Sequence, residues 1–514
     1  MQIAERKTGE RLVVYASAVF LLGVLVLVPP ALVNEAPFWD DKAYINNALI
    51  ASGRLDPRDA QGPFAEERPP LFWWMLTGIY LLNTPVEYAR LLSPLLTAAG
   101  IVVMFLLVSK LFNSLLAGIL SAVFTITLNY FVQTTSYILT DSSGSVLAFL
   151  ALLTFSLGLR YGPFLWVAGG LTAVSIMARD QNLLLLPVML LSMIWIARVP
   201  RTVKLFYLLF LGAVAAAAVW MRQEVFLQIL SDILTPIVTD VVYLPLLIVF
   251  TAAVLIAVYK IHEQKNLLSR RPSIEERAFD LLLGLAMMLF IMHPFFLDNV
   301  RLGEEFQIAG RGIFSRPVAH SIMVRDDIIR SGLSFLERVQ FWVAAFPSLL
   351  TAPLLAAAVA GAFLTLRNRV EEAKPLILWF ALTVAYIILF THIEYRFLVP
   401  TVQPAAALAA YAVARLFSMN RWLAFVAVGV VLVYAVFPTQ FYGVLPEFRE
   451  PVTVSGWRTM LDGGLGGWLT DYAAYLRDVQ KPPELKIAVI NLLAAWTTGP
   501  LLLAAAYVGV RNPL

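Results

Sequence analysis

The stretch PPLFWWMLTGIYLLN, from Pro69 to Asn83, determines the predicted membrane topology of the chain. It is apolar and aromatic, but about 15 residues are too few for a helix that crosses ~30 Å of hydrocarbon, which needs about 20. A double proline and paired tryptophans are typical of a segment that lies in the membrane interface or dips into it. We therefore predict an interfacial helix here.

The composition of the whole chain is that of a membrane protein. Hydrophobic residues make up 60% of the 514 residues and charged residues 14%, whereas soluble domains contain roughly 45–50% and ~25%. One buried core cannot account for this difference, because long apolar runs recur from one end of the chain to the other. The sequence predicts an all-α integral membrane protein with a single polytopic membrane domain, 1–514.

Charged turns divide the apolar runs into about 13–14 predicted transmembrane helices. Their approximate ranges are 12–33, 90–109, 115–136, 141–160, 163–178, 183–198, 203–221, 238–259, 279–296, 340–366, 375–391, 397–416, 421–441 and 486–508. The first run is longer than the apolar region of a usual signal peptide and has no clear small-residue cleavage site, so we interpret it as a retained span.

The basic residues give the predicted orientation. With 69–83 interfacial, the basic connections all fall on the side of the N-terminus, which is therefore predicted to be cytoplasmic. These connections are Lys110, Arg198/Arg201/Lys204, Lys260–Arg277, Arg367–Lys374 and Arg415–Arg421. The long loops 34–89, 297–339 and 442–485 are then extracytoplasmic, and the first of them is expected to carry juxtamembrane helices.

Several classes of function are excluded or disfavoured by composition. The chain has no cysteine, so disulfides and thiolate chemistry are absent, and its four histidines are scattered without the spacing of a metal site. A net charge of +4, with no basic stripe interleaved with aromatics, gives no indication of nucleic-acid binding.

Two adjacent carboxylates, Asp40 and Asp41, follow an aromatic pair at the start of the first outer loop. One interpretation is a helix N-cap, in which either carboxylate accepts backbone N–H groups of a helix that runs through Tyr44 to Ser52. The other is a general base at the membrane surface, whose partner orients it or raises its pKa by like-charge proximity. The sequence leaves both interpretations open.

Further charged residues are predicted on the same side of the membrane. They are Arg68 before the interfacial segment, Asp141 at the start of a span, Arg179 and Asp180 at the end of another, and Glu394 and Arg396 before a late span. Each alone is explained by snorkelling to the interface. Together they suit a phosphate-bearing substrate, because arginine binds phosphate bidentately and a carboxylate takes a proton from an acceptor.

The order of the motifs then becomes informative. They are Asp40-Asp41-Lys42-Ala43-Tyr44, Ser52-Gly53, Arg68-Pro69-Pro70 before aromatics, Ala89-Arg90-Leu91, Asp141, Arg179 and Tyr395-Arg396-Phe397-Leu398-Val399-Pro400. This order resembles that of the membrane-embedded glycosyltransferases of the GT-C fold that use polyprenyl-phosphate sugars. The branches it resembles most are the protein O-mannosyltransferases and the lipid A aminoarabinose transferases. Asp41 stands where these usually have Glu, and Asp180 where a small residue is more common.

The resemblance implies a multi-span GT-C-like helical bundle and an inverting hexosyl or pentosyl transferase in the cell membrane. Asp40 would deprotonate the acceptor hydroxyl, with Asp41 and Asp141 orienting the acceptor or the basic residues. The residues implied in substrate binding are Tyr44, Arg68, Arg179, Asp180, Glu394, Tyr395 and Arg396. Among them Arg68, Arg179 and Arg396 would hold the lipid phosphate.

The implied partners are a polyprenyl-phosphate-linked (dolichyl-phosphate-type) sugar donor, a protein, lipid or glycan acceptor, and membrane lipids. No cofactor and no tightly bound metal are predicted. The alternative is a Mg²⁺ or Mn²⁺ site built from the Asp40-Asp41 pair and Glu394.

Two other classes of protein are compatible with many spans and membrane-embedded charges. A secondary transporter usually shows paired repeats and charges near the middle of the membrane, whereas here the charges are predicted at the ends of spans and no repeat is visible. A structural or assembly membrane protein is the other class. Within the enzyme interpretation, the alternative is a GT-C enzyme whose acceptor is a lipid or glycan rather than a protein.

Overall fold

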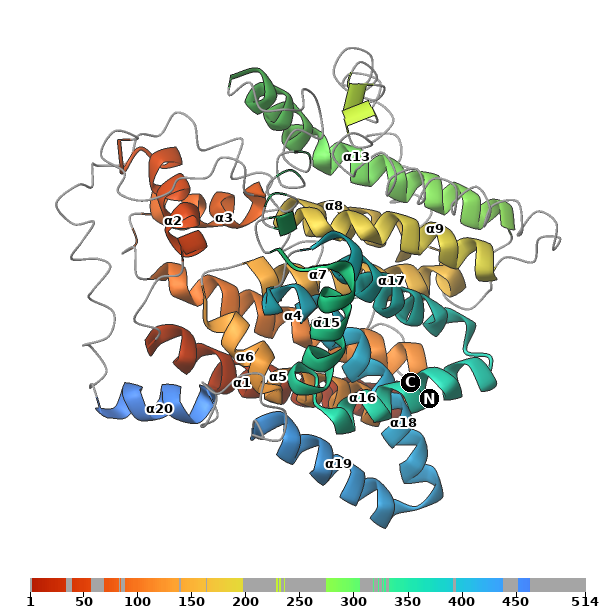
Figure 1. Ribbon diagram of the computed structural model, residues 1–514. Coiled ribbons are helices and arrows are strands. Elements are labelled where there is room, and N and C mark those ends of the chain that lie inside the picture. The colour runs from red at the N-terminus through yellow and green to blue at the C-terminus, as the bar shows by residue number, and fades with distance from the viewer. Residues whose placement is uncertain are drawn as a thin grey trace.

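The structure is a computed structural model (Figure 1). It describes residues 2–33, 39–56, 69–82, 84, 88–137, 140–162, 164–196, 228–229, 231–232, 235, 274–305, 318, 322, 326, 328–329, 332–391, 394–437 and 452–462. Every regular element described here is helical. These elements are α1 (Gln2–Val33), α2 (Trp39–Ala51), α3 (Pro70–Leu81), α4 (Ala89–Phe112), α5 (Leu115–Thr127), α6 (Asn129–Ser136), α7 (Thr140–Tyr161), α8 (Phe164–Ala178), η2 (Asp180–Leu184), α9 (Leu185–Ile196), α13 (Ile274–Glu305), α15 (Phe335–Leu349), α16 (Ala352–Arg367), η3 (Glu371–Ala373), α17 (Lys374–Phe390), η4 (Tyr395–Thr401), α18 (Val402–Met419), α19 (Arg421–Val436) and α20 (Val452–Asp462).

The prediction of an all-α membrane protein with many spans is confirmed. Within the described ranges, five helices are long and apolar enough to cross a membrane, and there are seven spans if each bent pair counts as one. Shorter apolar stretches, including α8, Asp280–His293 within α13, and α19, account for further predicted spans. The predicted spans 203–221, 238–259 and 486–508 lie outside the described residues.

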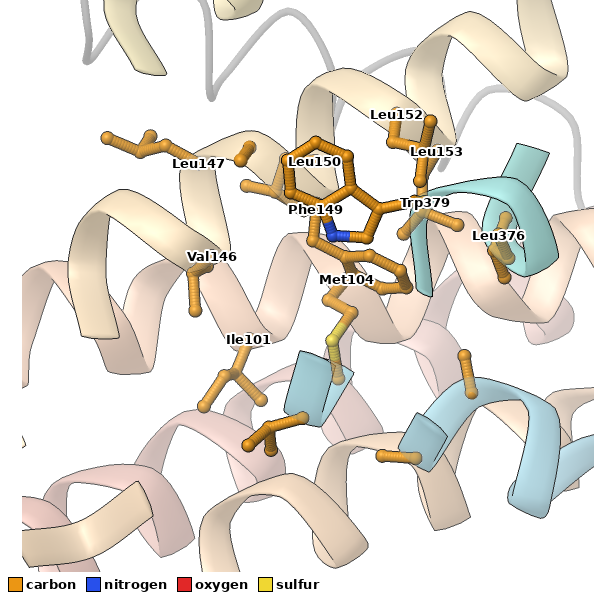
Figure 2. Packing of buried hydrophobic residues seen from close by; sticks show 14 of the residues in the cluster. Ile101, Met104, Val146, Leu147, Phe149, Leu150, Leu152, Leu153, Leu376 and Trp379 are labelled. Carbon is orange, nitrogen blue, oxygen red and sulfur yellow. The ribbon is translucent and has the colours of Figure 1, made fainter. Parts of the chain in front are cut away.

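Helix α7 lies at the centre of the bundle. It is buried from Thr140 to Leu159 and packs against α4, α8, α17, α18 and η4. Figure 2 shows part of this packing, in which Trp379 of α17 lies against Phe149 of α7, with Met104 of α4 beside them. A helix that is apolar on every side is expected where neighbouring helices surround it. The packing around α7 therefore fixes the positions of both its ends within the bundle.

The bundle has two chemically different ends. Gly162, with φ of 62°, turns the chain between α7 and α8, so the start of α7 and the end of α8 lie at the same end. Helix α1 runs antiparallel to α4, because the Arg90 guanidinium donates to the Leu32 carbonyl at 3.2 Å. Because Lys110 at the end of α4 lies beside Tyr161 at the end of α7, α4 and α7 run in the same direction. The C-terminal end of α1 therefore lies at the same end of the bundle as Asp141.

The basic connections gather at the opposite end. The Lys110 ammonium lies 5.2 Å from the centre of the Tyr161 ring, and the Phe112 and Tyr411 rings stack at 4.4 Å. The Tyr411 hydroxyl accepts from Asn368 at 3.0 Å and from Arg415 at 3.3 Å. The predicted gathering of basic connections on one side is thus seen for the described ones, at the end where α1 begins.

Two predicted spans are bent. The predicted span 115–136 is divided at Leu128, where extended backbone turns α5 and α6 by 63°. The predicted span 340–366 is divided between α15 and α16, which lie at 94°, and Thr351 at the break has φ of 61°. In the first case a polar run that includes Asn129, Thr134 and Thr135 follows the break, and its side chains face other helices rather than lipid.

Helices α2 and α3 form a small hairpin at the end of the bundle that holds Asp141 (left in Figure 1). Gly53, with φ of 71°, ends α2, since its N–H and that of Arg54 bond back to Ile50 and Leu49 at 2.9 Å. The Arg54 guanidinium then donates to the Thr84 carbonyl at 2.7 Å. At about 18 Å, α3 is too short to span a bilayer, as predicted for an interfacial helix.

Helices α8 and α13 cross closely at two glycines. A Cβ added to Gly169 would lie 1.9 Å from the Gly284 carbonyl oxygen, so only glycine permits this approach. Nearby, the Trp166 indole N–H donates to the buried Asp280 carboxylate at 3.0 Å. Small residues at such crossings are how membrane helices gain packing contacts without a hydrophobic driving force.

We expect Gly169→Ala to destabilise the protein by about 1–3 kcal/mol, the usual effect of overpacking a close contact. The measurement is thermal unfolding of the purified protein in detergent. Gly429→Ala in α19 is the matched control, because a Cβ there would meet no atom within 4 Å. Equal stability of the two variants would contradict the close crossing.

Candidate active site

A buried ion pair forms the centre of the candidate site. Asp141 is the second residue of α7, and Arg179 follows the last residue of α8 in extended backbone, with φ of −158°. The Arg179 Nη1 atom lies 2.7 Å from the Asp141 Oδ1 atom, and the two side chains are 7% and 6% exposed. Since a lone buried charge is costly, each of these groups requires the other.

The backbone around this ion pair is held closely. The Asn182 side-chain amide of η2 donates to the Gly144 carbonyl at 3.1 Å and to the Ser175 carbonyl at 2.8 Å. Gly144 lies one turn after Asp141, and a Cβ there would approach the Arg179 Cβ to 3.3 Å. The end of α8 is therefore tied to the first turn of α7, which positions Arg179.

A second ion pair comes from η4. The Arg396 Nε atom lies 2.5 Å from the Glu394 Oε1 atom, and these side chains are 19% and 25% exposed. The Phe397 ring lies near both pairs, with its centre 5.6 Å from the Arg179 guanidinium carbon and 5.9 Å from that of Arg396. Two arginines thus approach one aromatic ring, each with its own carboxylate.

Tyr130 of α6 lies among these charges. Its hydroxyl donates to the Tyr395 carbonyl, and it is within electrostatic range of the four charged groups of the two ion pairs, Asp141, Arg179, Glu394 and Arg396. The bend at Leu128 is what brings this tyrosine to the site. Tyr130 thereby joins α6 to the backbone of η4.

Two contacts attach η4 and the start of α18 to the core. The Trp379 indole N–H donates to the Pro400 carbonyl at 3.0 Å. The Gln403 side-chain amide donates to the Ser145 hydroxyl at 2.9 Å. Ser145 is one turn after Asp141 on α7. Both ion pairs are therefore positioned by contacts with the same helix.

Helix α2 approaches this cluster through Tyr44, whose hydroxyl lies 3.3 Å from that of Thr140, the residue before Asp141. The Tyr44 ring meets the Phe72 ring edge-on at 5.5 Å. Asp41 is buried, and Asp40 is the second residue of α2. The side chain of Asp40 and the whole of Arg68 lie outside the described residues.

The structure brings together four of the eight charged residues predicted for the site. Asp141, Arg179, Glu394 and Arg396 form one cluster, and Tyr44 joins it through Thr140. Tyr395 contributes its carbonyl oxygen to Tyr130, and its ring lies 5.3 Å from that of Phe341. Asp180 is buried as the first residue of η2.

Sequence reasoning missed Tyr130 and Thr140 as parts of this site and gave Phe397 no role. The signal for Tyr130 was available, since it lies in a segment with several polar residues, Asn129 to Ser136, inside a predicted span. No sequence pattern indicated that one aromatic ring would lie near both Arg179 and Arg396.

The described residues contain no group of three or more His, Asp or Glu side chains that could hold a metal ion. The alternative Mg²⁺ or Mn²⁺ site stays untested, because it includes the carboxylate of Asp40. The described carboxylates Asp141 and Glu394 are each engaged by an arginine.

Comparisons with solved structures agree with this architecture. ArnT from Cupriavidus metallidurans, solved bound to undecaprenyl phosphate, has a TM-score of 0.51 at 13% identity, with 97% of this chain and 76% of that chain covered. The likeness shows that the chain has a GT-C fold. No protein-family profile matches the chain, and no curated protein matches it in sequence.

A second likeness is weaker. The oligosaccharyltransferase AglB from Archaeoglobus fulgidus, in complex with an inhibitory peptide and a dolichol-phosphate, gives a TM-score of 0.44 at 13% identity over 87% of this chain. The same enzyme in the apo form gives the same values. This chain spans 56% of the length of the archaeal enzyme.

We expect Asp141→Asn to destabilise the fold by about 3 kcal/mol, because it leaves the Arg179 charge buried without its counter-charge. The double variant Asp141→Asn/Arg179→Gln should lose less stability than the two single variants together. Thermal unfolding of the four proteins in detergent gives the coupling. Strictly additive losses would show that the two residues do not depend on each other.

Proposed function

We propose that this protein is a glycosyltransferase that moves a sugar from a polyprenyl-phosphate donor to an acceptor hydroxyl, with inversion, at the extracytoplasmic face of a cell membrane. The observation that carries the proposal is the pair of arginine–carboxylate contacts around Phe397, at one end of a GT-C bundle. An anionic headgroup with an apolar tail suits a site of this kind, because the cations lie next to membrane-spanning helices.

The lipid phosphate is assigned to the arginines. Arg396 is the more accessible of the two described guanidiniums, so we give it the direct contact, together with Arg68. Arg179 is held by Asp141 and adds a fixed positive charge to the site. As the sugar leaves, negative charge develops on the phosphate, and preorganised cations stabilise such charge without reorganisation.

The acceptor is activated by Asp40 in this proposal. Its carboxylate takes the acceptor's hydroxyl proton while the acceptor oxygen attacks the anomeric carbon. The bond from that carbon to the phosphate oxygen breaks, and the polyprenyl phosphate leaves with the electron pair. Asp41 and Tyr44 on the same helix would orient the acceptor, and the contact from Tyr44 to Thr140 supports placing α2 next to the phosphate site.

An apolar groove gives the donor's isoprenoid tail a place to lie. It has a volume of about 560 Å³ and runs between α7, α8, α9 and α13, with Leu186, Met189 and Met193 of α9 along one side. Leu186, six residues after Asp180, is the lining residue nearest the charges along the chain. Phe155, near the end of α7, and Leu165, at the start of α8, place most of the groove toward the end that holds Lys110. The cations described at the other end, among them Lys110 and Arg415, support a cytoplasmic N-terminus.

Asp40→Asn is expected to abolish transfer, since loss of a general base typically costs 10²–10⁴-fold. The assay is transfer of labelled sugar from a polyprenyl-phosphate donor by the purified protein in proteoliposomes. Lys42→Gln, on the same turn of α2, is the control for folding and insertion. Undiminished turnover by Asp40→Asn would remove this carboxylate from the role of base.

Arg68→Ala and Arg396→Ala are expected to raise the KM for the lipid donor by about tenfold or more, because a charge-assisted hydrogen bond contributes ~1.5–3 kcal/mol. The KM for the acceptor should change little. Steady-state kinetics with each substrate varied in turn separates the two. An equal effect on donor and acceptor would contradict a role in binding the phosphate.

A further inference from the structure

Helix α1 contains a double proline near its C-terminal end, Pro29-Pro30. Proline has no backbone N–H, so the carbonyls four residues earlier, of Leu25 and Val26, have no hydrogen-bond donor within the helix. Inside a membrane such carbonyls must find other partners, because there is no water to replace the missing donors. The sequence of α1 therefore creates two acceptors in adjacent residues.

Helix α20, more than four hundred residues later in the chain, provides a donor to each of them. The Trp457 indole N–H donates to the Leu25 carbonyl at 2.9 Å, and the Thr453 hydroxyl donates to the Val26 carbonyl at 3.3 Å. Both carbonyls that the double proline leaves without a backbone donor therefore accept hydrogen bonds from side chains of one helix. Figure 1 shows α20 in blue beside α1.

Gly456 allows this approach. A Cβ at this position would lie 2.7 Å from the Pro30 nitrogen and 2.9 Å from its Cα, which are backbone atoms that cannot yield. The residues Thr453, Gly456, Trp457 and Met460 recur at the spacing of one helix face. Gly456 and Met460 are buried on that face, whereas Ser455, Arg458 and Thr459 are exposed.

We propose that α20 is a strap that docks on the double proline of α1 and fixes the C-terminal end of the first span. Trp457 and Thr453 are positioning residues, and Gly456 is the point of close contact. Helix α1 ends at Val33 and α2 begins at Trp39, so the strap holds the end of α1 that precedes the Asp40-bearing helix. The docking follows from the contacts alone, whereas its effect on transfer rests on the proposed function.

The docking can be measured by thiol labelling, because the natural chain has no cysteine. In the full-length protein in nanodiscs, Met460→Cys is expected to react slowly with a water-soluble maleimide, and Thr459→Cys on the exposed face to react fast. Adding Trp457→Phe to Met460→Cys should speed labelling about five-fold, the factor for one hydrogen bond of ~1 kcal/mol. Gly456→Ala should speed it further, and Ser455→Ala should not.

A swap of donors tests the hydrogen bond itself. Pro29→Ala restores a backbone N–H for the Leu25 carbonyl, so Trp457→Phe should accelerate labelling of the Met460→Cys protein less in that background than in the natural one. Fast labelling of Met460→Cys without further change, or no response to Trp457→Phe and Gly456→Ala, would overturn the docking. An equal response in both backgrounds would overturn the role of the missing N–H.

Kinetics test the link to transfer. Trp457→Phe is expected to lower kcat while the KM for the donor stays unchanged, since the strap holds the start of α2 rather than the arginines. An unchanged kcat in a variant with faster labelling would overturn the positioning role. If the unaltered protein transfers no sugar but shows the labelling pattern, the proposed function fails and the strap remains.

Discussion

The arrangement of the end of the bundle that holds Asp141 depends on one constraint, that a charge buried among membrane helices needs a counter-charge within contact distance. Asp141 and Arg179 meet at 2.7 Å although they belong to different helices. Their contact requires the start of α7 and the end of α8 to lie at one level. Gly144 and Asn182 hold the two backbones at the separation that this contact needs. The more exposed pair on η4 is then placed against the same ring, Phe397.

In the proposed anion site, the buried ion pair and the partly exposed one have different roles. Disturbing the buried pair, Asp141 and Arg179, is energetically costly, so it would contribute a fixed electric field to the site. The outer pair, Glu394 and Arg396, has access to solvent and can exchange one partner for another. Tyr130 connects the two by binding the η4 backbone while lying within reach of all four charges.

Apolar run lengths and basic connections were sufficient to predict the membrane fold, because the bilayer imposes a simple length rule on each span. They were not sufficient to predict the break at Leu128, where the backbone becomes extended inside a run long enough for one span. For the candidate site, charge type and motif order predicted Asp141, Arg179 and Arg396. The place of Phe397 beside both arginines follows only from tertiary packing, since an aromatic residue in a span is usually part of the core. The glycine crossing of α8 and α13 is likewise invisible without knowing which helices are neighbours.

The length of helix α7 sets the distance between the two polar ends of the bundle. It carries the Asp141–Arg179 pair at one end and Tyr161, beneath Lys110, at the other. Its 22 residues correspond to about 33 Å, close to the hydrocarbon thickness of an ordinary bilayer. The spacing of the two polar ends of α7 therefore matches the spacing of the two faces of such a membrane. In a thicker bilayer, lipid would cover one of these ends. How far the charged cluster lies below the headgroups is thus set jointly by the length of one helix and by the membrane in which it resides.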